Sequence, residues 1–220
     1  IAFIFMILVL KTKSYYYDAV GKAIDSRQLD SGELDIDFSL PVIQNTIASQ
    51  LENTDKFSLL FVLDIIKNEE IEPWIDKINK LKFFEDRDVR NAVITHFGGN
   101  SDLFSTQELH EISESNEKYA PEAIQHLKYR TNVDIDRFIK LVNSENEVVQ
   151  LSALCYLHEK KKTKVGLDEV QKRILNSNAP QEILKYVDEV SIYSVDFLDR
   201  LFDLESAEIR LICLKRVNLS

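Results

Sequence analysis

The feature that most constrains the fold is an internal repeat with a period of 30 residues. Apolar residues recur at an anchor position and at the positions four, five and eight residues after it. Successive anchors are 30 residues apart, except that the first step is 32 residues. The six anchors are Phe57, Val89, Tyr119, Val149, Ala179 and Ile209. These spacings lie on one stripe of an α-helix, so each anchor predicts a helix with one buried side.

A second column lies three residues before each anchor, and every member is a good helix N-cap. The side-chain oxygen of such a residue accepts a hydrogen bond from a free backbone N–H group in the first helical turn. The column contains Thr54, Asp86, Asn116, Asn146, Asn176 and Ser206. A looser helical pattern precedes each of these positions, such as Trp74, Ile78 and Leu81. The repeating unit is therefore a helix, a tight turn and a second helix, and its apolar stripe is buried only when the next unit stacks on it.

This unit resembles a HEAT repeat. The clearest match is residues 86–92 (DRDVRNA), which are similar to the turn and second helix of that family, and Ser206 to Arg210 matches in part. Asn146 to Gln150 lacks the arginine, so a continuous arginine ladder is not expected. The resemblance extends from about Leu40 to Ser220 and implies an all-α fold. The implied architecture is a HEAT-type α-solenoid, a right-handed superhelix of about six helical hairpins.

The first ten residues, Ile1 to Leu10, carry no charge. Ten helical residues cover about 15 Å, half of a bilayer core, so this run is interpreted as the end of a transmembrane helix. Lys11 and Lys13 follow it, and basic residues at a membrane exit mark the cytoplasmic side. Residues 11–39 are then a juxtamembrane segment with an acidic linker, and residues 40–220 are the repeat domain. In the alternative interpretation, the apolar run packs as the buried end of a soluble protein.

This order of segments is similar to the region after the membrane domain in bacterial ATP/ADP translocase-like nucleotide transporters of the major-facilitator type. The resemblance is carried by Asp55 to Asp64 and by Phe83 to Arg90. In that family the HEAT region is a cytoplasmic appendage, and the residues that handle nucleotide lie in the membrane helices.

The resemblance implies an interaction or regulatory domain on the cytoplasmic face of the inner membrane. Its partners would be other protein domains of the same longer chain, and the membrane through the N-terminal segment. Two alternatives stay open: a soluble HEAT-repeat adaptor or scaffold, and a HEAT-like lyase.

Net charge limits the partners further. The chain carries a formal charge of -10, which repels phosphate backbones, so nucleic acid is not expected to bind. The one basic run is Glu159 to Lys164, which falls between two repeats. It is predicted to be a solvated loop, and contact with anionic lipid headgroups is the alternative.

Catalytic and cofactor motifs are missing from the sequence. It contains no glycine-rich phosphate loop, zinc-ligand spacing, nucleophile elbow or paired-carboxylate motif, so no enzyme activity, cofactor or metal is expected. Cys155 has His158 three residues later but no orienting acid, and is interpreted as structural. Cys213 replaces Val93 in the same core column and is predicted to be buried.

One further column, seven residues after the anchor, is polar and aromatic. It contains Asp64, His96, His126, Tyr156, Tyr186 and Arg216. Stacked repeats would align these side chains at the edge of the core, which makes them a candidate partner-binding stripe. The alternative is a row of boundary residues with solvated tips. Metal binding by His96 and His126 is not expected, because no further ligand column accompanies them.

Overall fold

The computed structural model describes residues 37–115, 118–187, 192–204 and 206–217, without the side chains of residues 215–217. Within these residues the fold is all-helical and contains no strand, which confirms the predicted all-α class. No helix in the described part is long and apolar enough to cross a membrane. The predicted membrane-helix end at residues 1–10, and the linker up to residue 36, lie outside the described residues.

The described helices form six consecutive pairs. They are α2 (Pro41–Gln50) with α3 (Lys56–Ile65), α4 (Ile75–Leu81) with α5 (Arg87–Phe97), α6 (Thr106–Ser113) with α7 (Ala120–Leu127), α8 (Ile135–Leu141) with α9 (Glu147–Glu159), α10 (Leu167–Leu175) with α11 (Pro180–Lys185), and α12 (Val195–Phe202) with α13 (Ala207–Val217). A short 3-10 helix, η1 (Glu72–Trp74), leads into α4. The two helices of every pair contact each other, and the five predicted turn positions that the structure describes fall between paired helices.

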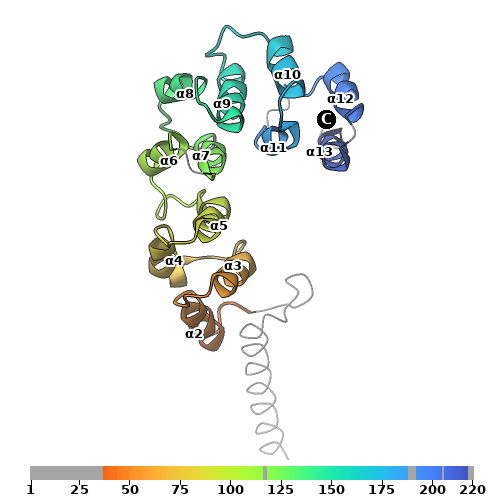
Figure 1. The fold of residues 1–220 in the computed structure, drawn as a ribbon. Coiled ribbons are helices and arrows are strands. Elements are labelled where there is room, and N and C mark those ends of the chain that lie inside the picture. Colours follow the sequence, from red (N-terminus) through yellow and green to blue (C-terminus); the bar gives the residue numbers. More distant parts are fainter. Residues whose placement is uncertain (1–36, 116–117, 188–191, 205, 218–220) are drawn as a thin grey trace, which may run out of the picture. The chain divides into compact units, whose positions relative to one another are not determined.

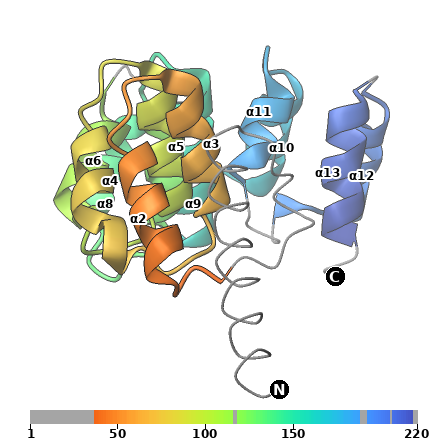
Figure 2. The ribbon, with the colours of Figure 1, turned by 90° about the horizontal axis from the view of Figure 1, so that it is seen from below.

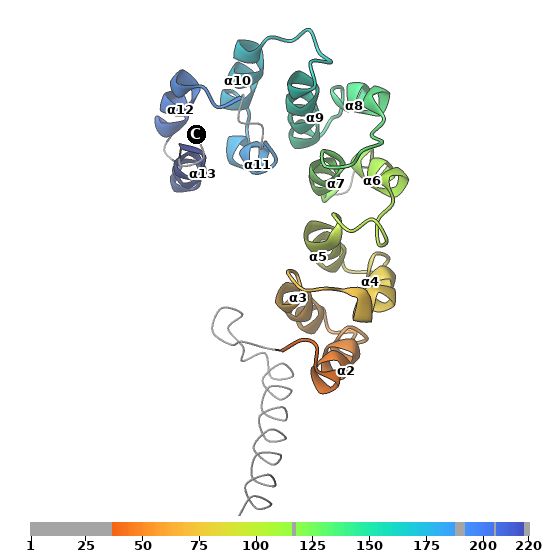
Figure 3. The same ribbon diagram turned by 180° about the vertical axis from the view of Figure 1, so that it is seen from behind.

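The chain divides after Phe97 into two compact units. In the first unit, α3 packs against α5. In the second unit, α7 contacts α9, α9 contacts α11, and α11 contacts α13. Within this unit α6, α8, α10 and α12 lie on one side and α7, α9, α11 and α13 on the other, as seen from the front and from behind (Figures 1 and 3). Figure 2 shows the pairs α10/α11 and α12/α13 from below.

The predicted apolar columns are buried in most of the second helices. The positions four and five residues after the anchor are at most 1% exposed in four helices: Val93 and Ile94 in α5, Ala123 and Ile124 in α7, Ala153 and Leu154 in α9, and Ile183 and Leu184 in α11. Cys213 in α13 is also fully buried, as predicted. In α13, however, Leu214 is 54% exposed.

In α3 the predicted register is wrong by one residue. Phe57, the predicted anchor, is 63% exposed, whereas Ser58 is buried. The 0, 4, 5, 8 pattern of buried residues starts at Ser58 and continues through Val62, Leu63 and Ile66. The N-cap shifts in the same way: Asp55, not Thr54, accepts a hydrogen bond from the Ser58 backbone N–H. The cap therefore sets the start of the helix and turns Phe57 away from the core.

The other predicted caps have mixed outcomes. Asp86 and Asn146 accept backbone N–H groups in the first turns of α5 and α9, and Ser206 does so for Ile209 of α13. Asn116 lies outside the described residues. Asn176 is wrong as a cap of α11, because it ends α10 instead. Helix α11 begins three residues after the expected start, with proline in its first turn, where the missing N–H group costs nothing.

The register of α3 is testable at its N-cap. Asp55→Ala should lower the free energy of unfolding by about 1 kcal/mol, because the Ser58 N–H loses its acceptor. Thr54→Ala is the matched control and should change stability by less than about 0.5 kcal/mol. Urea denaturation followed by circular dichroism measures both. A larger loss of stability in Thr54→Ala than in Asp55→Ala would show that Thr54 is the N-cap of α3, as the sequence predicted.

Candidate functional site

In the first unit, the predicted stripe brings Asp64 and His96 together. Both are half-buried, on α3 and α5, which pack against each other. Asp64 Oδ1 forms an ion pair with Lys67 Nζ at 2.7 Å. Burial lowers the pKa of His96, and the negative charge of Asp64 opposes that shift. The two side chains are thus close enough to interact electrostatically, but Asp64 already has a cationic partner.

In the second unit, the stripe does not form one exposed row. Tyr156 of α9 is 4% exposed, and its ring centroid lies 4.4 Å from that of Phe138, so most of the ring belongs to the core. His126 of α7 is half-buried. Tyr186 directly follows α11 and is also half-buried. The side chain of Arg216 lies outside the described residues. As a partner-binding surface, the stripe stays a prediction.

Tyr186 instead takes part in a contact that spans three helix pairs. Its hydroxyl donates a hydrogen bond to Glu122 Oε1 at 2.6 Å, and Lys128 Nζ donates to its backbone carbonyl. Glu122 lies in the first turn of α7, and Lys128 ends that helix. Helix α9 contacts both α7 and α11. The tyrosine therefore links the α10/α11 pair to the α6/α7 pair, although the α8/α9 pair separates them in the chain.

The carboxyl group of Glu122 lies in an environment that favours its neutral form. Its second oxygen, Oε2, is buried and accepts no hydrogen bond from any described residue. Burial raises the pKa of Glu122, although the hydrogen bond from Tyr186 acts in the opposite direction. Burial and the neighbouring Glu122 raise the pKa of Tyr186. The contact is thus between a neutral phenol and a carboxyl group that is costly to ionise.

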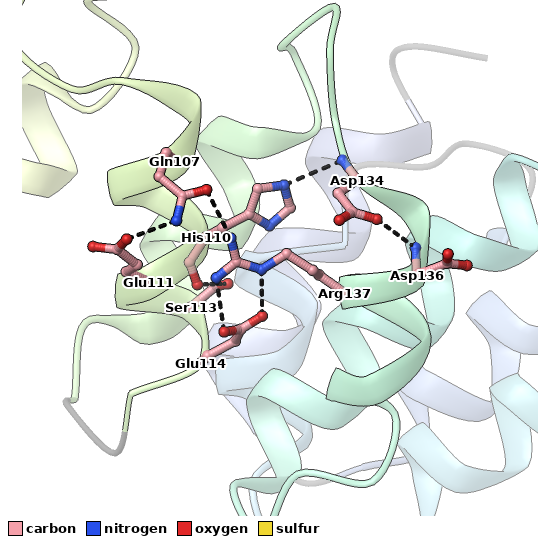
Figure 4. Close-up of polar contacts among 8 residues, drawn as sticks. All are labelled: Gln107, His110, Glu111, Ser113, Glu114, Asp134, Asp136 and Arg137. Atoms are coloured by element: carbon pink, nitrogen blue, oxygen red, sulfur yellow. Dashed lines mark hydrogen bonds and ion pairs between the residues drawn. The ribbon is translucent and has the colours of Figure 1, made fainter.

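A larger polar cluster joins α6 to α8 (Figure 4). Arg137 of α8 binds both carboxylate oxygens of Glu114, with Nε 2.5 Å from Oε1 and Nη2 2.7 Å from Oε2. Its Nη1 donates to Gln107 Oε1 at 3.1 Å, and Gln107 Nε2 donates to Glu111 at 2.7 Å. A planar guanidinium that binds a carboxylate through two parallel bonds fixes orientation as well as distance. The arginine therefore holds α8 at a defined angle to α6.

His110 is the buried centre of this cluster, with 3% of its surface exposed. Its Nε2 accepts a hydrogen bond from the backbone N–H of Asp134 at 3.2 Å, and Asp134 in turn caps α8 (Figure 4). The ring meets Phe138 edge to face, with centroids 6.0 Å apart. Because Nε2 is an acceptor, we assign the proton to Nδ1, which is buried without a partner among the described residues. Burial, and then the positive charge of Arg137, lower the pKa of His110.

The charged groups of the cluster bond to one another and join α6 to α8. Arg137 and Glu114 satisfy each other, and the Asp134 carboxylate accepts the Asp136 N–H at 2.9 Å instead of orienting His110. No three His, Cys, Asp or Glu side chains are arranged to hold a metal ion in the part of the chain that the structure describes. Cys155 and Cys213 are buried thiols, and neither forms a disulfide within the described residues.

The sequence did not single out His110, Arg137, Glu114 or Glu122. Acids such as Glu122 are common in first turns, where they interact with the helix dipole, so its spacing carried no signal of a contact with Tyr186. Comparison of the chain with models of protein families, with curated proteins and with solved structures finds no match. The function is therefore inferred from the chain's own residues.

The contact between Tyr186 and Glu122 is testable by a double-mutant cycle. Tyr186→Phe should lower the free energy of unfolding by about 1–3 kcal/mol, because it leaves the half-buried Glu122 carboxyl group without its donor. Glu122→Leu removes the acceptor, so Tyr186→Phe should cost less stability in that background than in wild type. Thermal and urea unfolding at neutral pH of both single variants and the double variant give the coupling. Strictly additive losses would show that the hydrogen bond contributes nothing.

His110 should make the second unit sensitive to acid. A folded-state pKa below the unfolded value of 6.5 means that the unfolded chain binds the proton more tightly. This contribution to stability is present above pH 6.5 and is lost as the pH falls below it. His110→Gln retains an acceptor for the Asp134 N–H and does not titrate, so its stability should fall less between pH 7.5 and about pH 5. Urea midpoints across this range measure the difference, and parallel pH profiles would contradict the assignment.

Proposed function

We propose that residues 40–220 form a HEAT-type α-solenoid that acts as an interaction and regulatory domain of a membrane nucleotide transporter, on the cytoplasmic side. The observation that carries the solenoid is serial packing of the second helices. In each unit, the second helix of one pair contacts the second helix of the next, and buried residues recur with the same spacing in most of these helices. Such nearest-neighbour packing is the defining property of repeat arrays.

Helix α9 supports serial packing most directly. All seven residues from Leu151 to Leu157 are buried. A helix on the surface of a globular protein has one wet face, whereas a helix covered on all sides is buried all round. Helix α9 contacts α7, α8, α10 and α11, so it is covered by both neighbouring pairs and by its own partner.

Polar bonds also join the turns of consecutive pairs. In the first unit, Lys56 at the start of α3 pairs with Asp86 at 3.2 Å, and also with Asp88, and both acids lie at the start of α5. In the second unit, Glu147 of α9 accepts a hydrogen bond at 2.8 Å from the hydroxyl of Ser177, which lies in the turn before α11. The turns of consecutive pairs therefore meet, as serial stacking requires.

An interaction role fits the exposed side chains better than catalysis does. The buried polar groups described above bond to one another and join helices. Large aromatic rings are exposed at the turns and pair junctions: Phe57 by 63%, Phe83 by 80% and Tyr129 by 72%. Aromatic side chains offer large contact areas at a small cost in side-chain entropy and are enriched in protein interfaces.

The membrane context of the proposal comes from the sequence before residue 37. It rests on the uncharged run up to Leu10, the lysines that follow it, and the resemblance to translocase-like transporters. The soluble HEAT-repeat adaptor is the competing function. It would use the same repeat architecture with Ile1 to Leu10 packed on the first pair.

Membrane fractionation of the complete gene product separates these two functions. The transporter domain should sediment with membranes, resist carbonate extraction, and expose residues 40–220 to protease in inverted vesicles but not in spheroplasts. A cytosolic protein and an established integral membrane protein serve as controls. Recovery of the complete product in the soluble fraction would remove the transporter assignment and leave the adaptor.

A further inference from the structure

The loop between α9 and α10 concentrates positive charge in an otherwise acidic chain. Lys160, Lys161, Lys162 and Lys164 are all exposed, as the sequence predicted for this run. The only acid in the run, Glu159, pairs with Lys160 at 3.2 Å. The chain as a whole carries a net charge of -10. We refer to residues 160–164 as the lysine loop.

The backbone of the lysine loop is held by hydrogen bonds at the end of α9. The Lys162 N–H donates to the Leu157 carbonyl at 2.8 Å, and the Lys161 N–H donates to the His158 carbonyl at 3.0 Å. These two bonds form the Schellman motif, in which the residue after the cap is left-handed and is usually glycine. Here that residue is Lys161, with φ of 54°. The left-handed conformation is unfavourable for a residue with a Cβ atom, so a lysine here occupies a position that usually contains glycine.

Stabilisation of α9 explains only part of this charge. Cations near a helix C-terminus interact favourably with the helix dipole, but the effect fades within the last turn. Lys160 lies there, with Nζ 5.4 Å from the centre of the Tyr156 ring. Lys162 and Lys164 lie beyond the helix end. Their ammonium groups are available to an external anion.

The chemistry of the lysine loop fits a diffuse anionic surface. Its charges are lysine ammonium groups, which act as point charges and do not make the planar, bidentate contacts of arginine. The loop has no aromatic side chain on which a nucleic acid base could stack. We propose that the lysine loop docks the domain on the anionic lipid headgroups of a membrane. This inference rests on the proposed membrane location, which supplies the surface.

The acidic remainder of the chain does not prevent such local attraction. At physiological ionic strength, charges more than about 8–10 Å apart are largely screened, so a lipid surface at the loop responds mainly to the loop. Each lysine near an anionic surface contributes about 1 kcal/mol, which corresponds to about fivefold in binding. Three lysines together correspond to roughly a hundredfold in binding to the anionic surface.

Vesicle co-sedimentation of residues 1–220 tests the docking. Vesicles of phosphatidylcholine alone are compared with vesicles that contain phosphatidylglycerol. The test variant is Lys161→Gln/Lys162→Gln/Lys164→Gln. The matched control is Lys80→Gln/Lys140→Gln/Lys172→Gln, which removes the same charge from exposed sites elsewhere. The apolar N-terminal run is identical in all three proteins, so differences among them report on the loop.

Wild type and the matched control should prefer phosphatidylglycerol vesicles, and the loop variant should lose between tenfold and a hundredfold of that binding. The preference should weaken with added salt. Equal losses in both variants would overturn the proposal, because only total charge would then matter. Displacement by inorganic phosphate at constant ionic strength, or loop-dependent binding of single-stranded RNA without vesicle binding, would also overturn it.

The outcome is independent of the membrane fractionation of the gene product. A soluble gene product whose lysine loop still binds anionic vesicles would contradict the transporter function and retain the docking surface. A membrane-bound gene product whose loop variant binds vesicles as well as wild type would contradict the docking surface and retain the transporter function. Circular dichroism spectra of the variants check that the helices are intact.

Discussion

The structure depends on the apolar stripe of each second helix, which no single pair can bury. Leu154 of α9 and Leu184 of α11 have no exposed surface, although each lies on a helix whose own partner covers only part of it. Burying such a side chain contributes roughly 2 kcal/mol, and much of that depends on the neighbouring pair. The helices involved are short, 6 residues in α11 and 8 in α7, and isolated helices of this length are unstable in water. Packing between pairs therefore holds the secondary structure as well as the tertiary structure.

This dependence explains why the all-α class and the helix pairs were predictable from the sequence. A stripe repeated every 30 residues encodes both the helix and the side that faces its neighbour, because both follow from local spacing. The first pair shows where such reasoning fails. Thr54 and Asp55 are adjacent cap candidates, and two apolar registers of α3 overlap at Val62. The buried register starts at Ser58, a small polar residue that a search for apolar columns passes over.

The polar contacts between pairs were not predictable for a different reason. Arg137 and Glu114 are 23 residues apart, and Tyr186 and Glu122 are 64 residues apart. Whether such side chains meet depends on the angle and offset between helix pairs. The sequence repeat predicts which residues of a helix face the adjacent pair, but it does not predict how that pair is rotated. His110 illustrates this limit, since its partner is the backbone of Asp134, which has no sequence signature.

The contacts between pairs in the second unit have opposite responses to pH. Burial lowers the pKa of His110 and raises the pKa of Glu122, so each environment favours the neutral group. The histidine contribution is lost as the pH falls below the unfolded value of 6.5. The glutamate acts in the other direction: its folded-state pKa is above the unfolded value of 4.5, so stability is lost as the pH rises through the folded value. The contact at His110 is therefore weakened when the histidine gains a proton, and the contact at Glu122 is weakened when the glutamate loses one. Two neighbouring joints of the same unit thus limit its stability at opposite ends of the pH range.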